Sequence, residues 1–312
     1  MAYIENFKNS VLTPSFCPGK YCGRVSYDNG TWSGCGACPR GYRANDESIC
    51  LLCMETLSLY DWLYLGFMTL LLLVLHWFFI DMVSMRRSFN KDVLILHGSA
   101  LIETGLACIC TLLLTDPIGS FRVRSCPIKN GADWYTLFHN PNLYYEETLH
   151  CTQEAVYPLY TVVFMLYGFA LLIMLVLRPW ICARCLPKQS KMSIYAAMYF
   201  IPILGLFHAV GAGILYYSYP FITVVLSVIS NAAHFALREN QTWKALFLDT
   251  ITDIRNCVIL LGHWCLHAYG IIAITTYKRI LPNPTHLLFL VPFPAIFYIS
   301  TAIFTDPNKV IP

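Results

Sequence analysis

Long apolar stretches follow one another along the chain after its first 56 residues, and short polar segments separate them. Each stretch reaches the roughly 17 to 25 residues that are needed to cross about 30 Å of hydrocarbon. The seven stretches are residues 58–80, 92–114, 155–177, 194–217, 220–238, 256–277 and 285–304. The pattern therefore predicts an all-α membrane protein with seven transmembrane helices.

The fourth and fifth stretches are separated only by Ser218 and Tyr219, which precede Pro220. Proline suits the first turn of a helix, because a residue there needs no backbone N–H. A single helix through both stretches would have about 44 residues, which is too long for one crossing. We therefore expect a tight hairpin between two spans.

The composition agrees with a polytopic membrane protein. Hydrophobic residues make up 57% of the 312 residues and charged residues only 12%, whereas a typical soluble domain has about 25% charged residues. The mean hydropathy is +0.54. The net charge of +3 indicates no nucleic-acid-binding surface.

Charged residues on either side of the first span predict the orientation of the chain. Residues 1–50 contain no cleavable signal sequence, so the first span itself must insert. Acidic residues precede this span, whereas Arg86, Arg87 and Lys91 follow it. Because positively charged flanks stay in the cytosol, we expect a lumenal N-terminus and, with seven spans, a cytosolic C-terminus. Arg178 is then counted among the basic residues at the edges of the cytosolic loops.

Cysteines are concentrated in the predicted lumenal head. Six lie in residues 1–56: Cys17, Cys22, Cys35, Cys38, Cys50 and Cys53. Their two C-x2-C pairs are also compatible with a tetrahedral zinc site. In an oxidising lumen, however, a head of this size is expected to need disulfides, because its apolar core is small. Six cysteines allow 15 pairings, and the spacing does not choose among them.

Two further cysteines, Cys126 and Cys151, lie in the long hairpin between the second and third spans. We expect them to form a second lumenal disulfide with each other. The predicted domains are the head at 1–56, a membrane domain at 57–304 that includes the lumenal hairpin 115–154, and a cytosolic tail at 305–312.

Two sequons provide a test of this orientation. The sequence Asn29-Gly30-Thr31 lies inside the head, so we expect Asn29 to be glycosylated. The sequence Asn240-Gln241-Thr242 lies in a predicted cytosolic loop, so we expect Asn240 to stay unmodified.

Ionisable residues within spans are costly and are therefore candidate functional residues. Glu103 lies in the middle of the second span, so it is expected to face the helix bundle, a partner or water. It is either functional or a neutral carboxyl hydrogen-bonded to another helix.

His263 and His267 lie one helical turn apart, and Ser230 and His234 show the same spacing upstream. The combination resembles the zinc signature of seven-helix intramembrane hydrolases such as alkaline ceramidases. No aspartate completes the ligand set, so interhelical hydrogen bonding is the preferred interpretation. We expect no metal, no cofactor and no catalytic residues.

Several runs of sequence match the wording of one known protein family. The run LYDWLYLGFM covers residues 59–68 and VLHWFFI covers residues 74–80. The other matching runs are residues 150–152, 154–161, 193–197, 267–272, 291–292 and 304–307. Together these runs extend over nearly the whole chain, and they resemble the Jun N-terminal kinase-associated membrane protein family, JAMP.

The resemblance implies an endoplasmic reticulum membrane adaptor rather than an enzyme. Its implied partners are proteasome subunits, a ubiquitin ligase of the same membrane and Jun N-terminal kinase. Only five residues follow Pro307, so we expect loops 178–193 and 238–255 to hold the proteasome or ligase contacts, and whether kinase binding is retained stays open. The alternatives are an intramembrane zinc hydrolase and a cysteine-rich membrane receptor.

Overall fold

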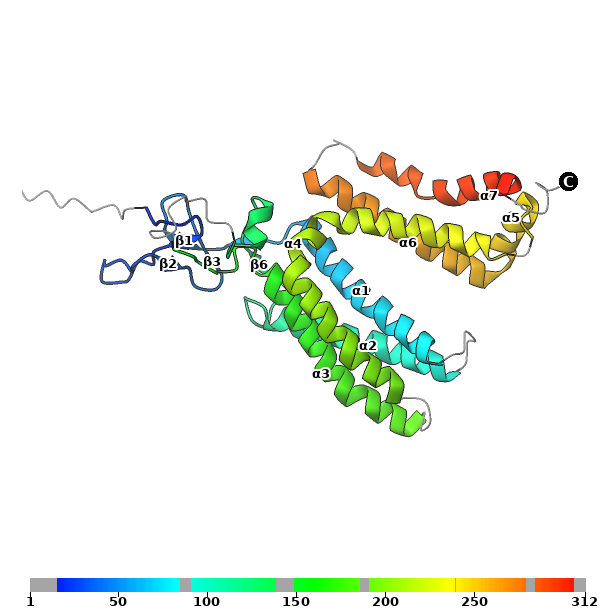
Figure 1. Cartoon of the computed structure of the whole chain (residues 1–312), viewed down its shortest axis with the longest axis horizontal. Helices are drawn as coiled ribbons and strands as arrows, with labels where there is room; N and C mark the ends of the chain where they lie inside the picture. Colours follow the sequence, from blue (N-terminus) through cyan, green and yellow to red (C-terminus); the bar gives the residue numbers. More distant parts are fainter. Residues whose placement is uncertain are drawn as a thin grey trace, which may run out of the picture. The chain divides into compact units, whose positions relative to one another are not determined.

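The computed structural model of the chain contains a small β-structured head and a set of apolar helices (Figure 1). The residues that it describes are 16–84, 91–138, 149–185, 191–238, 240–278 and 284–305. The chain divides into two units, of which the first comprises residues 1–57 and 72–209 and the second comprises residues 58–71 and 210–312. Helices α1 (Leu59–Ser84) and α4 (Lys191–Ala236) contribute to both units.

Three short antiparallel strand pairs organise the head in the first unit. They are β1 (Cys22–Gly23) with β2 (Gly36–Ala37), β3 (Tyr42–Ala44) with β4 (Cys50–Leu52), and β5 (Glu55–Thr56) with β6 (Arg124–Ser125). The third pair joins the head to the segment after α2 (Lys91–Leu114). The backbone therefore links the two segments that the sequence analysis predicts to lie on the same side of the membrane.

The backbone of the head packs closely against two cysteine sulfurs at Gly23. A Cβ atom at this position would lie 2.7 Å from the Sγ atom of Cys50 and 2.9 Å from that of Cys38. Any larger residue would therefore collide with a disulfide at the centre of the head.

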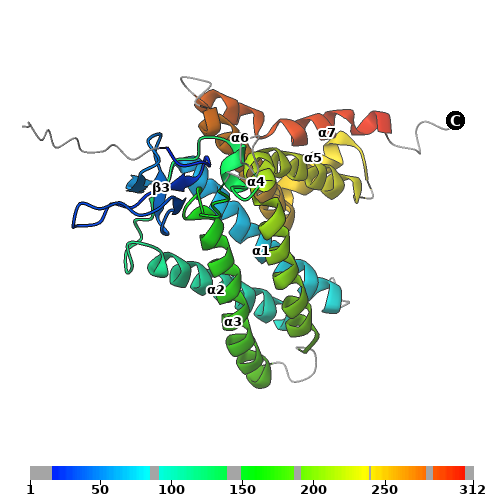
Figure 2. The same cartoon turned by 60° about the vertical axis from the view of Figure 1, so that its left-hand side comes forward.

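Apolar and small side chains hold the helices of the first unit together. These helices are α1 (Leu59–Ser84) from residue 72 onward, α2 (Lys91–Leu114), α3 (Leu159–Cys185) and α4 (Lys191–Ala236) up to residue 209. Helices α2 and α3 lie side by side (Figures 1 and 2). Leu73 and Ile80 of α1, Leu96 and Ala100 of α2, and Cys182 of α3 form one buried cluster.

The outward faces of these helices expose large apolar side chains. Ile102 is 54% exposed and Val176 is 75% exposed. Extended apolar surfaces of this kind are unfavourable in water but suit contact with lipid. Among the described residues, five helices are long and apolar enough to cross a membrane: Leu59–Met82, Lys91–Leu114, Leu159–Arg184, Lys191–Ala236 and Ile254–Tyr277.

The second unit combines the first part of α1, the later part of α4 and three further helices. These are α5 (Trp243–Thr252), α6 (Ile254–Lys278) and α7 (Phe293–Thr305), with a 3-10 segment, η2 (Pro284–Leu290), before α7. Phe235 of α4, Leu246 of α5, Leu260 of α6 and Ala295 of α7 share one buried cluster. This cluster explains why the polar segment after α4 folds back as a helix.

The expected hairpin between the fourth and fifth spans is wrong, because α4 runs without interruption through Pro220. Proline has no N–H, so it cannot donate to the carbonyl of Tyr216, four residues earlier. The Tyr60 hydroxyl donates to this carbonyl instead, at 2.7 Å. The hydrogen bond that Pro220 removes is thereby replaced, and the helix continues.

Replacing Tyr60 with phenylalanine should therefore leave the Tyr216 carbonyl unpaired. We expect a loss of about 1 to 3 kcal/mol in the free energy of unfolding, which is the cost of a buried unsatisfied acceptor. The loss should shrink in a Pro220→Ala background, where residue 220 regains its N–H. Denaturant titration of the four proteins in mixed micelles measures both effects. Equal losses in the two backgrounds would contradict the replacement.

Tyr64→Phe is the matched control for Tyr60→Phe. The Tyr64 hydroxyl lies 3.4 Å from the carbonyl oxygen of Ala212. Unlike the Tyr216 carbonyl, this oxygen still has a backbone N–H four residues later in α4 to accept, that of Tyr216 itself. Its removal should therefore cost less than the removal of the Tyr60 hydroxyl.

Two other expectations need correction. The predicted cytosolic loop 238–255 contains α5, whose Leu246 is only 1% exposed because it packs into the cluster of the second unit. The seventh apolar stretch is not one helix, because η2 ends at Leu290 and α7 begins at Phe293, after Pro292. The described residues contain seven α-helices but five candidate spans, so seven spans are not confirmed.

Candidate functional site

Four disulfides join the head and the hairpin into one body, which we call the cross-linked face (residues 16–57, 115–138 and 149–157). Two lie within the head, Cys17–Cys35 and Cys38–Cys50. The other two connect the head to the hairpin, Cys22–Cys151 and Cys53–Cys126. All eight cysteines that were expected to form disulfides are therefore bonded.

The expected pairing of Cys126 with Cys151 is wrong. Each of these residues bonds to a cysteine of the head instead. The strand pair β5–β6 places Cys53 and Cys126 near each other, because Glu55 lies opposite Ser125. The head and the hairpin are consequently not separate disulfide domains.

An ion pair that the sequence analysis did not find lies at the centre of the cross-linked face. The Arg43 guanidinium, on β3, donates to the carboxylate of Asp133 at 2.9 Å. Arg43 also donates to the backbone carbonyls of Pro127 and Ala155. The Tyr21 hydroxyl donates to the other oxygen of Asp133 at 3.0 Å. One of three arginines in the head and one of two aspartates in the hairpin give no sequence signal that they meet.

The Asp133 carboxylate is held in its ionised form. Burial opposes ionisation, but the backbone N–H groups of Lys129 and Asn130 and the Arg43 guanidinium together lower the pKa of Asp133 below its ordinary value of 3.8. The side chain of Asp133 is fully buried. Burial and the neighbouring Asp133 carboxylate raise the pKa of Tyr21 well above its ordinary value, so Tyr21 stays a hydrogen-bond donor. This cluster fixes the hairpin against the head.

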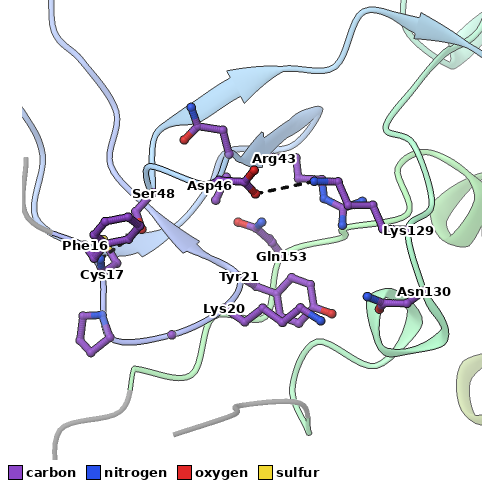
Figure 3. A pocket seen from close by; sticks show the side chains of 14 residues that line it. Phe16, Cys17, Lys20, Tyr21, Arg43, Asp46, Ser48, Lys129, Asn130 and Gln153 are labelled. Atoms are coloured by element: carbon purple, nitrogen blue, oxygen red, sulfur yellow. Dashed lines mark hydrogen bonds and ion pairs between the residues drawn. The ribbon is translucent and has the colours of Figure 1, made fainter.

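A pocket of about 480 Å³ opens beside this cluster (Figure 3). Residues of the head and of the hairpin form its wall together: Phe16, Cys17, Pro18, Gly19, Lys20, Tyr21, Arg43, Ala44, Asn45, Asp46, Ser48, Lys129, Asn130 and Gln153. Its volume is within the range of about 300 to 1,000 Å³ that is typical of small-molecule sites. The pocket exists only because the disulfides and the Arg43–Asp133 pair bring the two segments together.

Some polar groups of the wall are used in hydrogen bonds within the protein, and others are free to contact a ligand. Ser48 accepts the backbone N–H of Cys17, and the side-chain oxygen of Asn45 accepts the N–H of Ile49, so both maintain loop geometry. Lys129 and Asp46 approach each other only loosely, with 3.9 Å between Nζ and Oδ1. Figure 3 shows the Gln153 amide near the middle of the pocket. This arrangement can bind a polar ligand.

Inside the first unit, Glu103 forms a fully buried ion pair with Arg178. The guanidinium donates to both carboxylate oxygens, at 2.5 and 3.1 Å, and neither side chain is exposed. Ser99 also donates to Glu103, at 2.6 Å. The prediction that Glu103 faces the interior of the helix bundle therefore agrees with its position between α2 and α3.

Arg178 connects this ion pair to two further helices. It donates to the backbone carbonyl of Ser193, in the first turn of α4, at 3.3 Å. Its Nη2 atom also lies 3.1 Å from Nδ1 of His76 on α1. Arg178 was assigned to a cytosolic loop, yet it is buried within α3.

In the second unit, His263 and His267 of α6 lie against serines of α4. His263 is 3.0 Å from the hydroxyl of Ser230, and His267 is 2.7 Å from that of Ser227. The two histidines therefore bond between helices, as the preferred interpretation expected. Across the residues that the structure describes, no three His, Cys, Asp or Glu side chains are grouped to hold a metal ion.

Both sequons adopt the same local structure. The Asn29 side-chain oxygen accepts hydrogen bonds from the backbone N–H and the hydroxyl of Thr31. Asn240 accepts the equivalent bonds from Thr242. Both asparagines are exposed. Local structure therefore does not distinguish them, so only the side of the membrane can decide which one is glycosylated.

The apolar helices and the cross-linked face define a helical membrane protein with a disulfide-bonded extramembrane region. The sequence model of the family described as JNK1/MAPK8-associated membrane protein matches residues 17–307. The chain belongs to this family, which confirms the resemblance found in the sequence.

Relatives in animals match over most of their length. The chain is 45% identical over 303 residues to the JNK1/MAPK8-associated membrane proteins of Mus musculus and Homo sapiens, with 95% of this chain and 95% of each relative covered. It is 32% identical over 277 residues to the Caenorhabditis elegans homolog, with 88% of this chain and 85% of the relative covered. No solved structure matches the chain.

Proposed function

We propose that this protein is an endoplasmic reticulum membrane adaptor that links misfolded-protein stress to degradation in the cytosol. In this role it recruits proteasome subunits and a ubiquitin ligase of the same membrane, and it associates with Jun N-terminal kinase. The observation that carries the proposal is the family membership, since the relatives are named for their association with JNK1.

The first unit contains a continuous set of contacts that suits such an adaptor. Disulfides fix the cross-linked face to the segments that follow α2 and precede α3. Near the C-terminal end of α3, the Arg178 side chain joins the middle of α2 to the first turn of α4. We propose that the cross-linked face is lumenal and that the α3–α4 connection is cytosolic. A change in the lumen would then reach the cytosolic side through rigid helices.

Proximity labelling from the C-terminus in cells under folding stress tests the adaptor role. We expect enrichment of proteasome subunits, a membrane ubiquitin ligase and Jun N-terminal kinase over a fusion to an unrelated protein of the same membrane. A His263→Ala/His267→Ala variant should give the same enrichment, because an adaptor needs no catalytic histidine. Labelling without proteasome or ligase subunits would contradict the adaptor role.

Glycosylation tests the proposed orientation separately. We expect that Asn29→Gln abolishes the mobility shift produced by glycosidase treatment, because Asn29 would lie in the lumen with the oligosaccharyltransferase. Asn240→Gln is the matched control, since it removes a sequon of the same local structure. It should leave the shift unchanged where the segment 191–238 crosses the membrane twice, as the seven-span prediction has it, and it should reduce the shift where the continuous helix α4 crosses once. Gel electrophoresis before and after glycosidase treatment gives the answer. The reverse pattern would show that the orientation is inverted.

A further inference from the structure

The side chain of Gln153 places an unused hydrogen-bond donor in the pocket of the cross-linked face. Gln153 is 8% exposed. Its Oε1 atom accepts the backbone N–H of Cys38 at 2.5 Å. Because a backbone N–H can only donate, this bond fixes which end of the amide is oxygen and which is nitrogen. The Nε2 atom is then buried without a hydrogen-bond partner.

A buried donor without a partner is unfavourable and rare in folded proteins. The Cys38 bond prevents the amide from turning to find another partner. The backbone of Gln153 is also fixed, since its backbone carbonyl accepts the Thr136 hydroxyl at 3.0 Å. The donor is therefore held at the wall of the pocket, and a ligand that reaches Nε2 can accept its hydrogen bond.

Two lysines add positive charge at the same pocket. Lys20 lies with its Nζ atom 5.3 Å from the centre of the Tyr21 ring, and Lys129 is 58% exposed. The third cation of the wall, Arg43, is occupied by Asp133 and by two backbone carbonyls. An amide N–H and two ammonium groups together favour a ligand group that accepts hydrogen bonds and carries negative charge.

We propose that this pocket binds a carboxylate group, from either a small organic acid or an acidic side chain of a polypeptide. Asp46 also lies in the wall, so a singly charged carboxylate is repelled less than a doubly charged phosphate. A carboxylate offers two acceptor oxygens, one for the Gln153 amide and one for a lysine. The proposal goes beyond the adaptor role and does not depend on it.

Binding of short blocked peptides to the purified full chain in nanodiscs, with its disulfides intact, tests the proposal. The probe is acetyl-Gly-Glu-Gly-amide, and its neutral counterpart is acetyl-Gly-Gln-Gly-amide. Isothermal titration calorimetry should show that the glutamate peptide binds at least about 10-fold more tightly, as expected for hydrogen bonds to a charged group. Acetate and inorganic phosphate are titrated in parallel. Acetate that binds as tightly as the glutamate peptide assigns the pocket to small acids, whereas tighter peptide binding assigns it to polypeptide side chains.

Variants of the wall separate the pocket from the general charge of this face. Lys129→Gln and Lys20→Gln should each weaken binding of the glutamate peptide several-fold, because both lysines line the pocket. Gln153→Glu should weaken it by about 10-fold or more, because an acceptor replaces the donor. Arg122→Gln is the control, since it removes one exposed positive charge of the cross-linked face outside the pocket.

Four outcomes would overturn the proposal. These are equal affinity for the two peptides, no binding of the glutamate peptide or acetate at millimolar concentration, an equal loss from Arg122→Gln and Lys129→Gln, and phosphate binding as tight as carboxylate binding. Circular dichroism of each variant, together with the retained mobility of its disulfide-bonded form on non-reducing gels, identifies any variant that fails to fold. The exposed Lys129→Gln variant keeps the test decisive if Gln153→Glu does not fold.

Discussion

Replacing Arg178 with methionine should lower the free energy of unfolding by about 3 to 5 kcal/mol, because it leaves a charged carboxylate buried without its partner. Glu103 and Arg178 are both fully buried. The same substitution removes the donor to the Ser193 carbonyl and the contact with His76. Unfolding in mixed micelles, followed by tryptophan fluorescence, measures the loss.

A second substitution distinguishes an unpaired charge from simple loss of packing. The double variant Glu103→Leu/Arg178→Met should be more stable than Arg178→Met alone, because removing both charges abolishes the desolvation cost. Lys129→Gln is the control for an exposed ion pair, and it should leave stability nearly unchanged, since such pairs contribute little. A double variant no more stable than Arg178→Met alone would contradict this interpretation of the ion pair.

The sequence identified Glu103 as unusual but could not identify its partner. The rule that flanking positive charges lie in the cytosol treats every arginine at the end of an apolar stretch as solvated. Arg178 follows such a stretch, yet α3 continues to Cys185 and buries it. The two residues of the pair are 75 positions apart. Only the packing of α2 against α3 brings them together.

The helix bounds likewise depend partly on local sequence and partly on contacts with residues that are distant in the sequence. The bounds of α2 and α6 follow closely from their apolar stretches, because twenty or so apolar residues have few alternatives in a membrane. The continuity of α4 depends instead on the Tyr60 hydroxyl, which is 156 residues away from Tyr216. Pro220 alone predicts a helix start, and no local pattern indicates that a distant side chain replaces its missing donor.

The pocket was not predicted, for a related reason. Its wall combines the head with residues 129, 130 and 153 of the hairpin. The expected Cys126–Cys151 disulfide left the hairpin without a covalent link to the head, so the sequence did not indicate which residues of the two segments would line a shared pocket. Cysteine counts predict that a face is cross-linked, but the pairing depends on which strands meet, here β5 and β6.

Removal of the Cys22–Cys151 disulfide should have a larger effect on stability than removal of a disulfide within the head. Cys22 and Cys151 are 129 residues apart, whereas Cys38 and Cys50 are 12 residues apart. In the chain-entropy model the stabilisation grows with the length of the closed loop. Because Cys53–Cys126 already joins the head to the hairpin, the loop that Cys22–Cys151 closes is shorter than the sequence separation, and we expect it to contribute about 4 kcal/mol, against about 3 kcal/mol for Cys38–Cys50. Cys22→Ser/Cys151→Ser and Cys38→Ser/Cys50→Ser are therefore a matched pair of double variants.

The long disulfide also affects the pocket, because it joins the hairpin segment that contains Gln153 to the head. Cys151 lies two residues before Gln153, so its loss should free the Gln153 segment from the head and weaken carboxylate binding as well as stability. Non-reducing digestion with mass spectrometry should find the Cys22 and Cys151 peptides linked in the native protein. A linked Cys126–Cys151 peptide would instead restore the pairing expected from the sequence, and it would remove the covalent link that brings the two walls of the pocket together.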